Sequence, residues 1–520
     1  MMKLFIILVT ALVLLFPCEA TNDEKQEFYE NPVVPGDFPD PTIIRVDDTY
    51  YAAGTSSDFG GNYPLYESKD LVNWDQIGYV FNELPAWASD SFWAPELYYQ
   101  DGTFYVYYAA KRKSDRISCI GVATTTDIHE GFTDRGIVVE WGDEAIDAFV
   151  FQDDEGGRYI SWKAYGLTEG RPVEILCSEL SSDGLELVGE HFSLTDHAKG
   201  WEGSGHEGQC IVKKDDYYYM FYSIGGCCDN QCSYRVRVAR SKELRSGWEQ
   251  YPEPILEGGE EWVCPGHGTL VSTSYGRDFY LYHSYHATDF EYVGRQGMLD
   301  EVVWDEETGW PRFKNGNTPT VKGVVPFDDT IQKRDTVFYD DFSIAENNHL
   351  WQWDITMEKP DFAAKDGNLS LSPGEDGLAF LGRRPKTGDY SLTVDMPVEP
   401  SLNKGLCIYG NQQNVLALNA TPEGLTLFQI AGGDKNSLAV VDRPEGDGVQ
   451  LKVEVRNGRF YRFFYSPDNK NWVPVKMGDE YVVDGKFLPS WGAGIRAGVF
   501  VDGKTTEKSS FSEVRFDYEY

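Results

Sequence analysis

Five ionisable residues recur at nearly regular intervals in the first 270 positions of this 520-residue chain. They are Asp40, Glu96, Asp147, Glu207 and His267. Carboxyl groups held close together suit general acid–base catalysis, in which one group must accept a proton while another donates one. A third carboxylate nearby can tune and orient the donor. The residue types therefore indicate an acid–base site, provided that the fold brings them together.

Each of these residues precedes a short alternating apolar run that contains a pair of residues, usually aromatic. The pairs are Tyr50-Tyr51, Phe104-Tyr105, Arg158-Tyr159, Tyr218-Tyr219 and Phe279-Tyr280. The second member recurs after 54, 54, 60 and 61 residues, and the ionisable residue stands 9 to 13 positions before it. A repeat of about 40–60 residues built from short strands is typical of a propeller, with one blade per repeat. Because equivalent positions of the blades meet at one axis, we expect the five residues to form a ring there.

The local sequence of the three strongest candidates favours the same interpretation. Asp40 stands between two prolines, which restrict the backbone; an ordinary Asp-Pro turn would look the same, and Asp37 is a competitor. Asp147 is a lone charge in an apolar run, so it is either paired structurally or kept for function. Glu207 has glycines nearby on both sides, which leave room for a ligand, and Glu202 is a nearby alternative. Partial burial beside other carboxylates would keep Glu207 protonated and able to donate.

The composition fits an all-β protein with neutral partners. The chain holds 32 Tyr, 29 Phe and 14 Trp among 52 Gly and 25 Pro, and segments of helical period are scarce after the N-terminus. With 84 Asp+Glu against 46 Lys+Arg, the net charge is −38. This charge would repel nucleic acid and anionic membrane surfaces.

Residues 1–20 are predicted to be an export signal. Lys3 is followed by the apolar stretch from Leu4 to Phe16, which is too short to span a bilayer, and no other segment could span one. Cleavage after Ala20 would place the mature protein in the periplasm or outside the cell. The alternative is a lipoprotein signal, with the chain anchored through an acylated Cys18.

The chain divides into two units in this interpretation. Residues 21–330 carry the repeats and are expected to form a five-bladed β-propeller. The polar segment 331–336 would be the linker, and residues 337–520 have alternating runs that predict a β-sandwich with an accessory role. Cys227, Cys228 and Cys232 form the one dense cysteine cluster, for which a loop disulfide is favoured over a metal site because the spacing is not a zinc pattern.

The motifs together resemble glycoside hydrolase family 43. They include Gly36 to Ile43, Trp93-Ala94-Pro95-Glu96, Ile146 to Phe151, Glu207 to Ile211, Gly266-His267-Gly268 and the stretch from Gly294-Arg295 to Pro311. The resemblance covers the whole repeat region with all motifs in order, and the C-terminal unit is similar to the concanavalin-like (jelly-roll) sandwich of many members. Two departures stand beside the candidate site. Gln209 replaces a common proline, and Ala148 and Phe149 follow the middle aspartate where a small residue or proline, then serine, is usual.

The resemblance implies roles for the individual residues. Asp40 would be the general base, Glu207 the general acid, and Asp147 the group that tunes and orients the acid. Trp93, Glu96 and Arg295 would bind the sugar. No cofactor is required for the chemistry, but His267 would face a calcium or sodium ion near the axis; a hydrogen-bonded core histidine is the alternative.

The expected function is that of an exo-acting, inverting glycosidase on side chains of plant cell-wall polysaccharides. An α-L-arabinofuranosidase or β-D-xylosidase is favoured by the resemblance, while endo-arabinanase and galactan-directed activities stay open. A carbohydrate-binding propeller without catalysis is the alternative from a different class. It has no need of three neighbouring carboxylates, whose mutual repulsion is costly.

Overall fold

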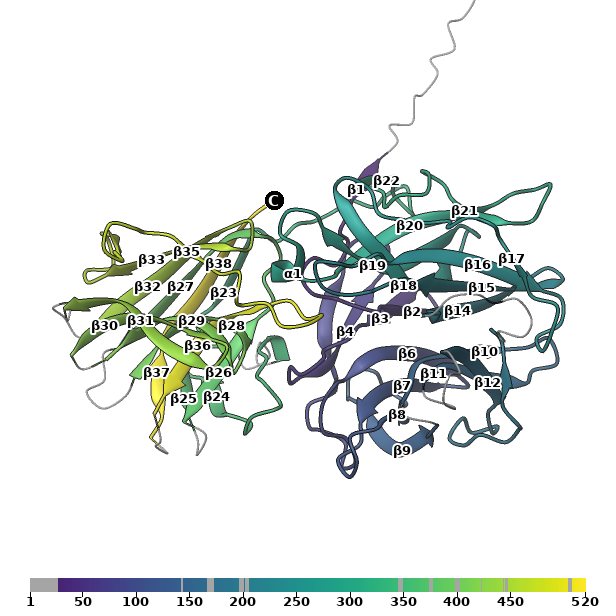
Figure 1. The fold of residues 1–520 in the computed structure, drawn as a ribbon, viewed down its shortest axis with the longest axis horizontal. Helices are drawn as coiled ribbons and strands as arrows, with labels where there is room; N and C mark the ends of the chain where they lie inside the picture. The colour runs from purple at the N-terminus through teal and green to yellow at the C-terminus, as the bar shows by residue number, and fades with distance from the viewer. Residues whose placement is uncertain are drawn as a thin grey trace, which may run out of the picture.

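A computed structural model describes residues 27–141, 144–165, 173–195, 201, 205–344, 349–373, 377–397, 403–421, 423–442, 444, 448–503 and 507–520. Two β domains lie side by side in it, and the chain passes from one to the other once (Figure 1). The predicted signal at residues 1–20, with Cys18, and the alternative acid Glu202 lie outside the described residues. Among those described, no helix is long and apolar enough to cross a membrane.

The N-terminal domain is a five-bladed propeller, as the repeats predicted. The inner strands of the five blades are β2 (Thr42–Val46), β6 (Trp93–Gln100), β10 (Glu144–Gln152), β14 (Glu207–Lys214) and β18 (Trp262–Ser272). Each inner strand contacts the next and β18 contacts β2, so the ring is closed. The remaining strands of the blades are β3 (Thr49–Ala53), β4 (Asn62–Ser68), β5 (Asp75–Phe81), β7 (Thr103–Lys111), β8 (Ser118–Thr125), β9 (Thr133–Val139), β11 (Arg158–Tyr165), β12 (Glu174–Glu179), β13 (Phe192–Ser193), β15 (Tyr217–Ile224), β16 (Arg235–Ser241), β17 (Glu249–Gln250), β19 (Asp278–His286), β20 (Gln296–Trp304) and β21 (Pro311–Phe313).

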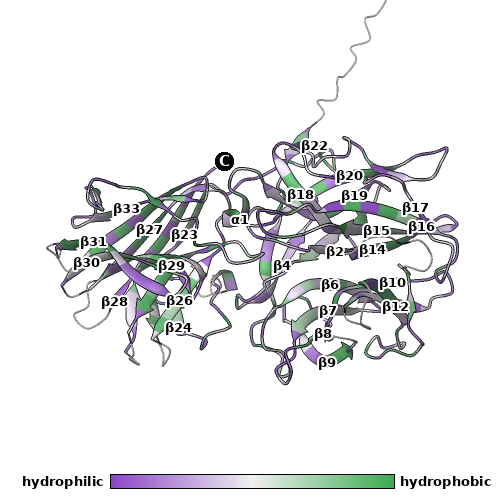
Figure 2. Ribbon diagram, in the orientation of Figure 1, coloured by the Kyte–Doolittle hydropathy of each residue, from purple (hydrophilic) through white to green (hydrophobic). Residues whose placement is uncertain are grey.

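The recurring aromatic pairs lie on the second strand of each blade, at β3, β7, β11, β15 and β19. Because side chains alternate along a strand, the two members of a pair face opposite sides of the blade and pack between neighbouring blades. Tyr51 of the first blade and Phe104 of the second meet at 5.6 Å between ring centroids, and Tyr218 of the fourth blade meets Phe151 of the third at 6.4 Å. Hydrophobic residues accordingly follow the strands, whereas the outer loops are mainly hydrophilic (Figure 2). The aromatic residues are thus what spaces the blades around the axis.

Two short elements complete this domain. Strand β1 (Phe28–Glu30) pairs with β22 (Lys322–Val324), so the start of the described chain is tied to the end of the propeller. The helix α1 (Phe290–Val293) leads into β20. Residues 331–336, which are all described, form no strand before the second domain begins.

The C-terminal domain is a sandwich of two large antiparallel sheets with a smaller third one. One sheet has the order β23-β38-β27-β32-β33-β34 with β35 beside β33, the second β26-β36-β28-β29-β30-β31, and the third β24-β25-β37. Apolar residues from the sheets form one core that includes Trp351, Leu392, Leu418 and Phe516. The strands are β23 (Val337–Asp340), β24 (Asp361–Lys365), β25 (Asn368–Ser372), β26 (Leu378–Arg383), β27 (Asp389–Pro397), β28 (Asn403–Asn411), β29 (Asn414–Ala420), β30 (Gly424–Ala431), β31 (Asp434–Asp442), β32 (Gly448–Arg456), β33 (Phe460–Ser466), β34 (Val473–Pro474), β35 (Val483–Asp484), β36 (Arg496–Asp502), β37 (Ser509–Phe511) and β38 (Glu513–Glu519).

A buried ion pair joins the two domains beside the propeller axis. Arg496 of the sandwich is 1% exposed, and its Nη1 lies 3.2 Å from Oδ2 of Asp37. The same guanidinium covers the ring of Phe59 at 4.0 Å. Removal of one partner from a buried pair leaves the other charge uncompensated, so the pair fixes the domains to one another. It also commits the Asp37 carboxylate to the domain interface, which removes Asp37 as a competitor of Asp40.

Candidate active site

The inner strands share one irregularity that places residues at the axis. In β6, β10, β14 and β18 the pairing register shifts at a bulge, and one residue in each bulge has a positive φ: Ala94 (35°), Asp147 (55°), Gly208 (58°) and His267 (42°). Asp40 (51°) holds the matching place, two residues before the first paired residue of β2. A bulge changes the direction in which the side chain of the extra residue points, and in these strands that side chain turns toward the axis.

This register corrects the expected ring. Asp40, Asp147 and His267 occupy the equivalent position, but Glu207 stands one residue before it and Glu96 two residues after it. The prediction that all five are equivalent is therefore wrong for the two glutamates. Counting back from the aromatic pair could not show this, because the turn between the first two strands differs in length from blade to blade.

Asp40 is held by four partners. Its Oδ1 accepts a hydrogen bond from Nη1 of Arg295 at 2.8 Å, and its Oδ2 accepts one from the Thr55 hydroxyl at 2.7 Å. Its backbone N–H donates to Nδ1 of His283 at 3.0 Å, and the pKa of this wholly buried histidine is lowered by burial and by Arg295, so the ring is neutral. Burial alone would raise the pKa of Asp40, but the Arg295 charge, His267, His283 and the Thr55 hydroxyl hold it well below the usual range. Asp40 is thus a rigid, ionised carboxylate.

Asp147, on the third blade, lies at the axis between His267 of the fifth blade and Gly208 of the fourth. Nδ1 of His267 lies 3.5 Å from Oδ1 of Asp40 and 4.0 Å from Oδ2 of Asp147. The N–H of Gly208, next to Glu207, is 3.3 Å from that same Oδ2. Burial, with a smaller contribution from the neighbouring Glu207 carboxylate, raises the pKa of Asp147 although His267 opposes the shift. The three carboxyl groups Asp40, Asp147 and Glu207 are therefore brought into one cluster.

Glu207 makes an ion pair that the sequence motifs did not predict. Its Oε2 contacts Nζ of Lys163, a lysine on β11 that is only 3% exposed. Lysine is almost never fully buried without a partner. Lys163 stands in the apolar run Trp162-Lys163-Ala164, so the sequence could have marked it as a paired or functional charge, as it marked Asp147. Lys163 belongs to the site because it places a fixed positive charge beside the candidate acid.

Gln209 explains one departure from the family pattern. Its Nε2 donates to the backbone carbonyl of Asp147 at 2.6 Å and lies 3.1 Å from the Ser161 hydroxyl. A proline could make neither contact, since its ring has no donor. Gln209 therefore ties the bulge of the third blade to the strand that begins with Glu207.

Glu96 lies apart from this cluster. Its Oε2 accepts a hydrogen bond from the Thr42 hydroxyl at 2.7 Å, and its Oε1 accepts one from the N–H of Val150 at 3.3 Å. Burial raises its pKa to about 8, so it carries a proton near neutral pH. The structure places Glu96 further along the channel than Asp40, where it links three blades, and gives no support to its predicted contact with the sugar.

The sandwich contributes a loop to the rim of the site. Nη2 of Arg295 donates to the carbonyl of Gly492 at 3.2 Å, and the next residue back, Trp491, meets Trp93 at 6.1 Å between centroids with the rings at 62°. Trp491 is 65% exposed, which leaves one of its faces open to a ligand. A sugar ring bound beside Asp40 would therefore meet an aromatic wall from each domain.

Two disulfides lie in and beside the propeller loop that packs against this rim. Cys227 is bonded to Cys228, and Cys232 is bonded to Cys264 on β18, three residues before His267. Gly492 packs directly on Cys228, since a Cβ at that glycine would come within 3.5 Å of the cysteine. The cluster thus forms disulfides, as favoured from its spacing, but the partner of Cys232 lies outside the cluster.

The surroundings of His267 do not form an ion site made of protein ligands. Calcium prefers six to eight oxygen ligands, whereas this histidine offers a nitrogen and its two neighbouring carboxylates are already engaged. Across the described ranges, no group of three or more His, Cys, Asp or Glu side chains could hold a metal ion.

Comparison with known proteins agrees with the geometry. The profile of glycosyl hydrolases family 43 matches residues 29–311, and that of the β-xylosidase C-terminal concanavalin A-like domain matches residues 339–519. A xylan 1,3-β-xylosidase from a Vibrio species is 26% identical over 86% of this chain and 90% of its own length. An extracellular exo-α-(1→5)-L-arabinofuranosidase of Cellvibrio japonicus is 30% identical over 53% of this chain and 86% of its own.

Solved structures share the arrangement of both domains. A xylan β-1,4-xylosidase from Bacillus halodurans superposes with a TM-score of 0.81 at 22% identity, covering 94% of this chain and all of its own. A family 43 protein from Bacillus licheniformis gives the same score at 24% identity over 95% of this chain. The chain belongs to glycosyl hydrolase family 43, a family of inverting O-glycosyl hydrolases, and carries the concanavalin A-like domain of its β-xylosidases.

Proposed function

We propose that this enzyme is an exo-acting glycosidase that removes α-L-arabinofuranosyl or β-D-xylosyl units from plant polysaccharides. The observation that carries the proposal is the cluster of Asp40, Asp147 and Glu207 at the axis, with Asp40 locked in its ionised form by Arg295. Several relatives bear the names of β-xylosidases or arabinofuranosidases, which supports this choice of sugar.

In the proposed reaction Asp40 is the general base and Glu207 the general acid. The Asp40 carboxylate takes a proton from a water molecule while the water oxygen attacks the anomeric carbon. The bond to the leaving oxygen breaks, and Glu207 gives its proton to that oxygen, so one water is consumed and the configuration is inverted. Asp147 positions Glu207 through the Gly208 N–H and does not itself exchange a proton with the substrate.

The buried charges balance if the pair formed by Asp147 and Glu207 keeps one proton. Asp40 is neutralised by Arg295, and Lys163 supplies one further positive charge against two carboxyl groups. A second unpaired carboxylate in this buried place would be costly, and burial accordingly raises the pKa of Asp147 to about 6. This arrangement supports an acid role for Glu207 despite its contact with Lys163.

Exo action is supported by the loop of the sandwich at the rim. A cavity of about 620 Å³ lies between the domains and is lined by Trp93, Trp491, Lys111 and Asn411, among others. It could hold the sugar of the leaving group, while the Gly492 contact with Arg295 closes the other side. The two disulfides suit an oxidising compartment, which supports our further proposal that residues 1–20 direct export.

Hydrolysis of 4-nitrophenyl α-L-arabinofuranoside and 4-nitrophenyl β-D-xyloside tests the choice of sugar. We expect turnover of at least one, with the sugar released in the inverted configuration as seen by NMR immediately after cleavage. Activity on neither glycoside, together with release of oligosaccharides from arabinan or galactan, would replace the exo proposal by an endo or galactan-directed activity of the same family.

The pH dependence tests the role of Arg295. Loss of its charge in Arg295→Met should raise the pKa of Asp40, so the acidic limb of kcat/KM should move to higher pH by about 1–3 units. The limb moves to higher pH because the base works only when ionised, so activity is lost as the pH falls through the pKa of Asp40. Arg295→Lys keeps the charge and should move the limb less, and Arg515→Met, an exposed control, should not move it. An unmoved limb in Arg295→Met would show that Asp40 is not the base.

A further inference from the structure

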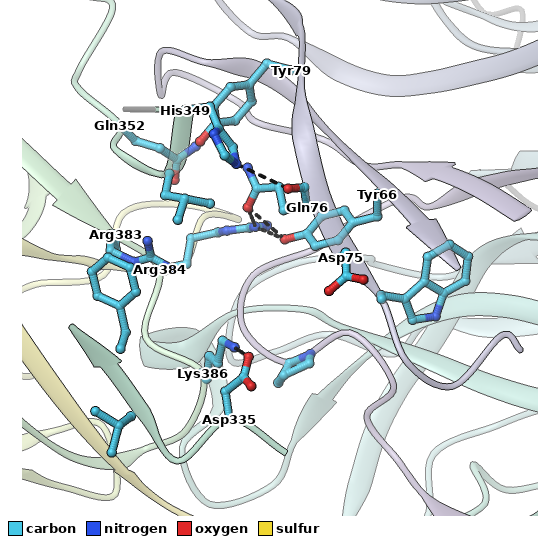
Figure 3. Close-up of a pocket in the computed structure, with 15 residues that line it drawn as sticks. Tyr66, Asp75, Gln76, Tyr79, Asp335, His349, Gln352, Arg383, Arg384 and Lys386 are labelled. Atoms are coloured by element: carbon cyan, nitrogen blue, oxygen red, sulfur yellow. Dashed lines mark hydrogen bonds and ion pairs between the residues drawn. The ribbon is translucent and has the colours of Figure 1, made fainter. Parts of the chain in front are cut away.

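A second cavity, of about 340 Å³, lies between the first blade and the sandwich (Figure 3). Tyr66 and Gln76 line it from the propeller, and Arg383, Arg384 and Lys386 line it from the segment that leaves β26. It shares no lining residue with the cavity beside Trp93 and Trp491, and the proposed reaction uses none of its residues.

The cavity is rich in positive charge, unlike the rest of this acidic chain. Three cations line it, against the two carboxylates Asp75 and Asp335. Lys386 pairs with Asp335 at 2.9 Å, and Asp335 is 72% exposed, so that pairing is largely screened. Burial lowers the pKa of both Lys386 and Arg383, and neighbouring cations add to the shift. The three positive charges therefore lack a full counterbalance in the described part of the chain.

Several buried donors in the cavity have no acceptor. Within the described residues, Nε and Nη1 of Arg383 and Nε2 of Gln76 are buried without a hydrogen-bond partner. Oε1 of Gln76 accepts from Tyr66 at 3.2 Å and from Nη2 of Arg384 at 3.4 Å, and the same amide also interacts with the Tyr79 hydroxyl. The Arg383 guanidinium lies over the Phe338 ring at 3.4 Å and also interacts with the Tyr518 hydroxyl. Neither tyrosine contact has the geometry of a hydrogen bond to the donors named above. An unsatisfied buried donor costs about 1–3 kcal/mol.

We propose that this cavity binds a small oxyanion, with Arg383, Gln76 and Lys386 as its donors. An oxyanion supplies acceptors and negative charge, which are the two things that the cavity lacks. Inorganic phosphate, sulfate and the carboxylate of a uronic acid share this chemistry, and the cavity volume admits each of them.

The bound anion would connect the two domains. It would join Gln76 of the propeller to Arg383 and Lys386 of the sandwich. Nη1 of the adjacent Arg384 donates to the carbonyl of Asp37 at 2.6 Å, and Asp37 stands three residues before Asp40. The bound anion would thus stabilise the domain interface next to the segment that carries the base.

Thermal unfolding of the full chain at constant ionic strength tests this inference, with chloride replaced stepwise by phosphate, sulfate or glucuronate. In wild type we expect Tm to rise with the logarithm of the anion concentration, by about 2–3 °C once the anion reaches 100 times its Kd. Arg383→Met should lose this logarithmic rise, and Arg383→Lys should keep part of it. Arg462→Met, an exposed arginine on β33, is the matched control and should respond as wild type does.

The variants separate specific binding from the general effect of salts. Phosphate and sulfate also stabilise folded proteins by exclusion from their surface, an effect that grows in proportion to their concentration and does not depend on one arginine. Equal responses in wild type, Arg383→Met and Arg462→Met would therefore overturn the site. If Arg383→Met does not fold, calorimetric titration of wild type with phosphate decides, because no heat of saturable binding would also overturn it. A response to glucuronate alone identifies a uronic acid as the ligand, and a response to phosphate or sulfate identifies an inorganic anion.

Discussion

Replacement of Glu207 by alanine is expected to lower kcat/KM by an amount that depends on the leaving group. On a xylo- or arabino-oligosaccharide the loss should be on the order of 10³–10⁴, the upper part of the range for general acid catalysis. On a 4-nitrophenyl glycoside it should be about 10–100-fold, because nitrophenolate is a stable anion that leaves with little help from a proton. Rates on both substrates under the same conditions measure the difference.

The control for this prediction is Lys163, the buried partner of Glu207. Lys163→Met keeps the acid but removes its fixed positive neighbour, so it should alter the basic limb of the pH profile without creating a strong dependence on the leaving group. Glu207→Gln, which preserves the shape of the side chain, should behave like Glu207→Ala. Equal losses on the two substrates in Glu207→Ala would contradict an acid role and would mean that the glutamate binds sugar or supports the fold.

The propeller could be predicted from sequence because the same short pattern recurs within each blade. One residue pair per blade, aromatic in four of the five and near the start of the second strand, is enough to set the number of blades and the order of their strands. Asp40, Asp147 and Glu207 could likewise be named, since each is a charge in an unusual setting: between prolines, in an apolar run, or between glycines.

The contacts between blades could not be predicted in the same way. Lys163 meets Glu207 44 residues later because the third and fourth blades are neighbours, and Arg295 meets Asp40 across 255 residues because the ring closes. The bulges that shift Glu96 and Glu207 out of the equivalent position depend on φ at single residues, which the alternation of side chains does not reveal. Cys232 pairs with Cys264 for a similar reason, as the two lie on neighbouring blades.

Removal of the Asp40 carboxylate should lower kcat/KM by about 10²–10⁴ whatever the leaving group. The base acts on water and not on the departing oxygen, so oligosaccharide and 4-nitrophenyl glycoside should lose activity alike in Asp40→Asn. The asparagine keeps the size of the side chain and an acceptor for the Thr55 hydroxyl. Breaking a buried ion pair is costly, by about 3–5 kcal/mol, so Tm must be measured alongside to show that the variant is folded.

Addition of azide distinguishes a variant that lacks only the base from one whose active site is damaged. In Asp40→Ala the lost carboxylate leaves space beside Arg295, whose positive charge would attract a small anion. Azide needs no deprotonation before it attacks the anomeric carbon, so it should restore turnover of the 4-nitrophenyl glycoside and yield a glycosyl azide of inverted configuration. Glu207→Ala retains Asp40 in that place, so azide should not restore its activity by this route. Failure of azide to rescue a folded Asp40→Ala protein that still binds the sugar would argue that Asp40 positions Arg295 and that another group activates the water.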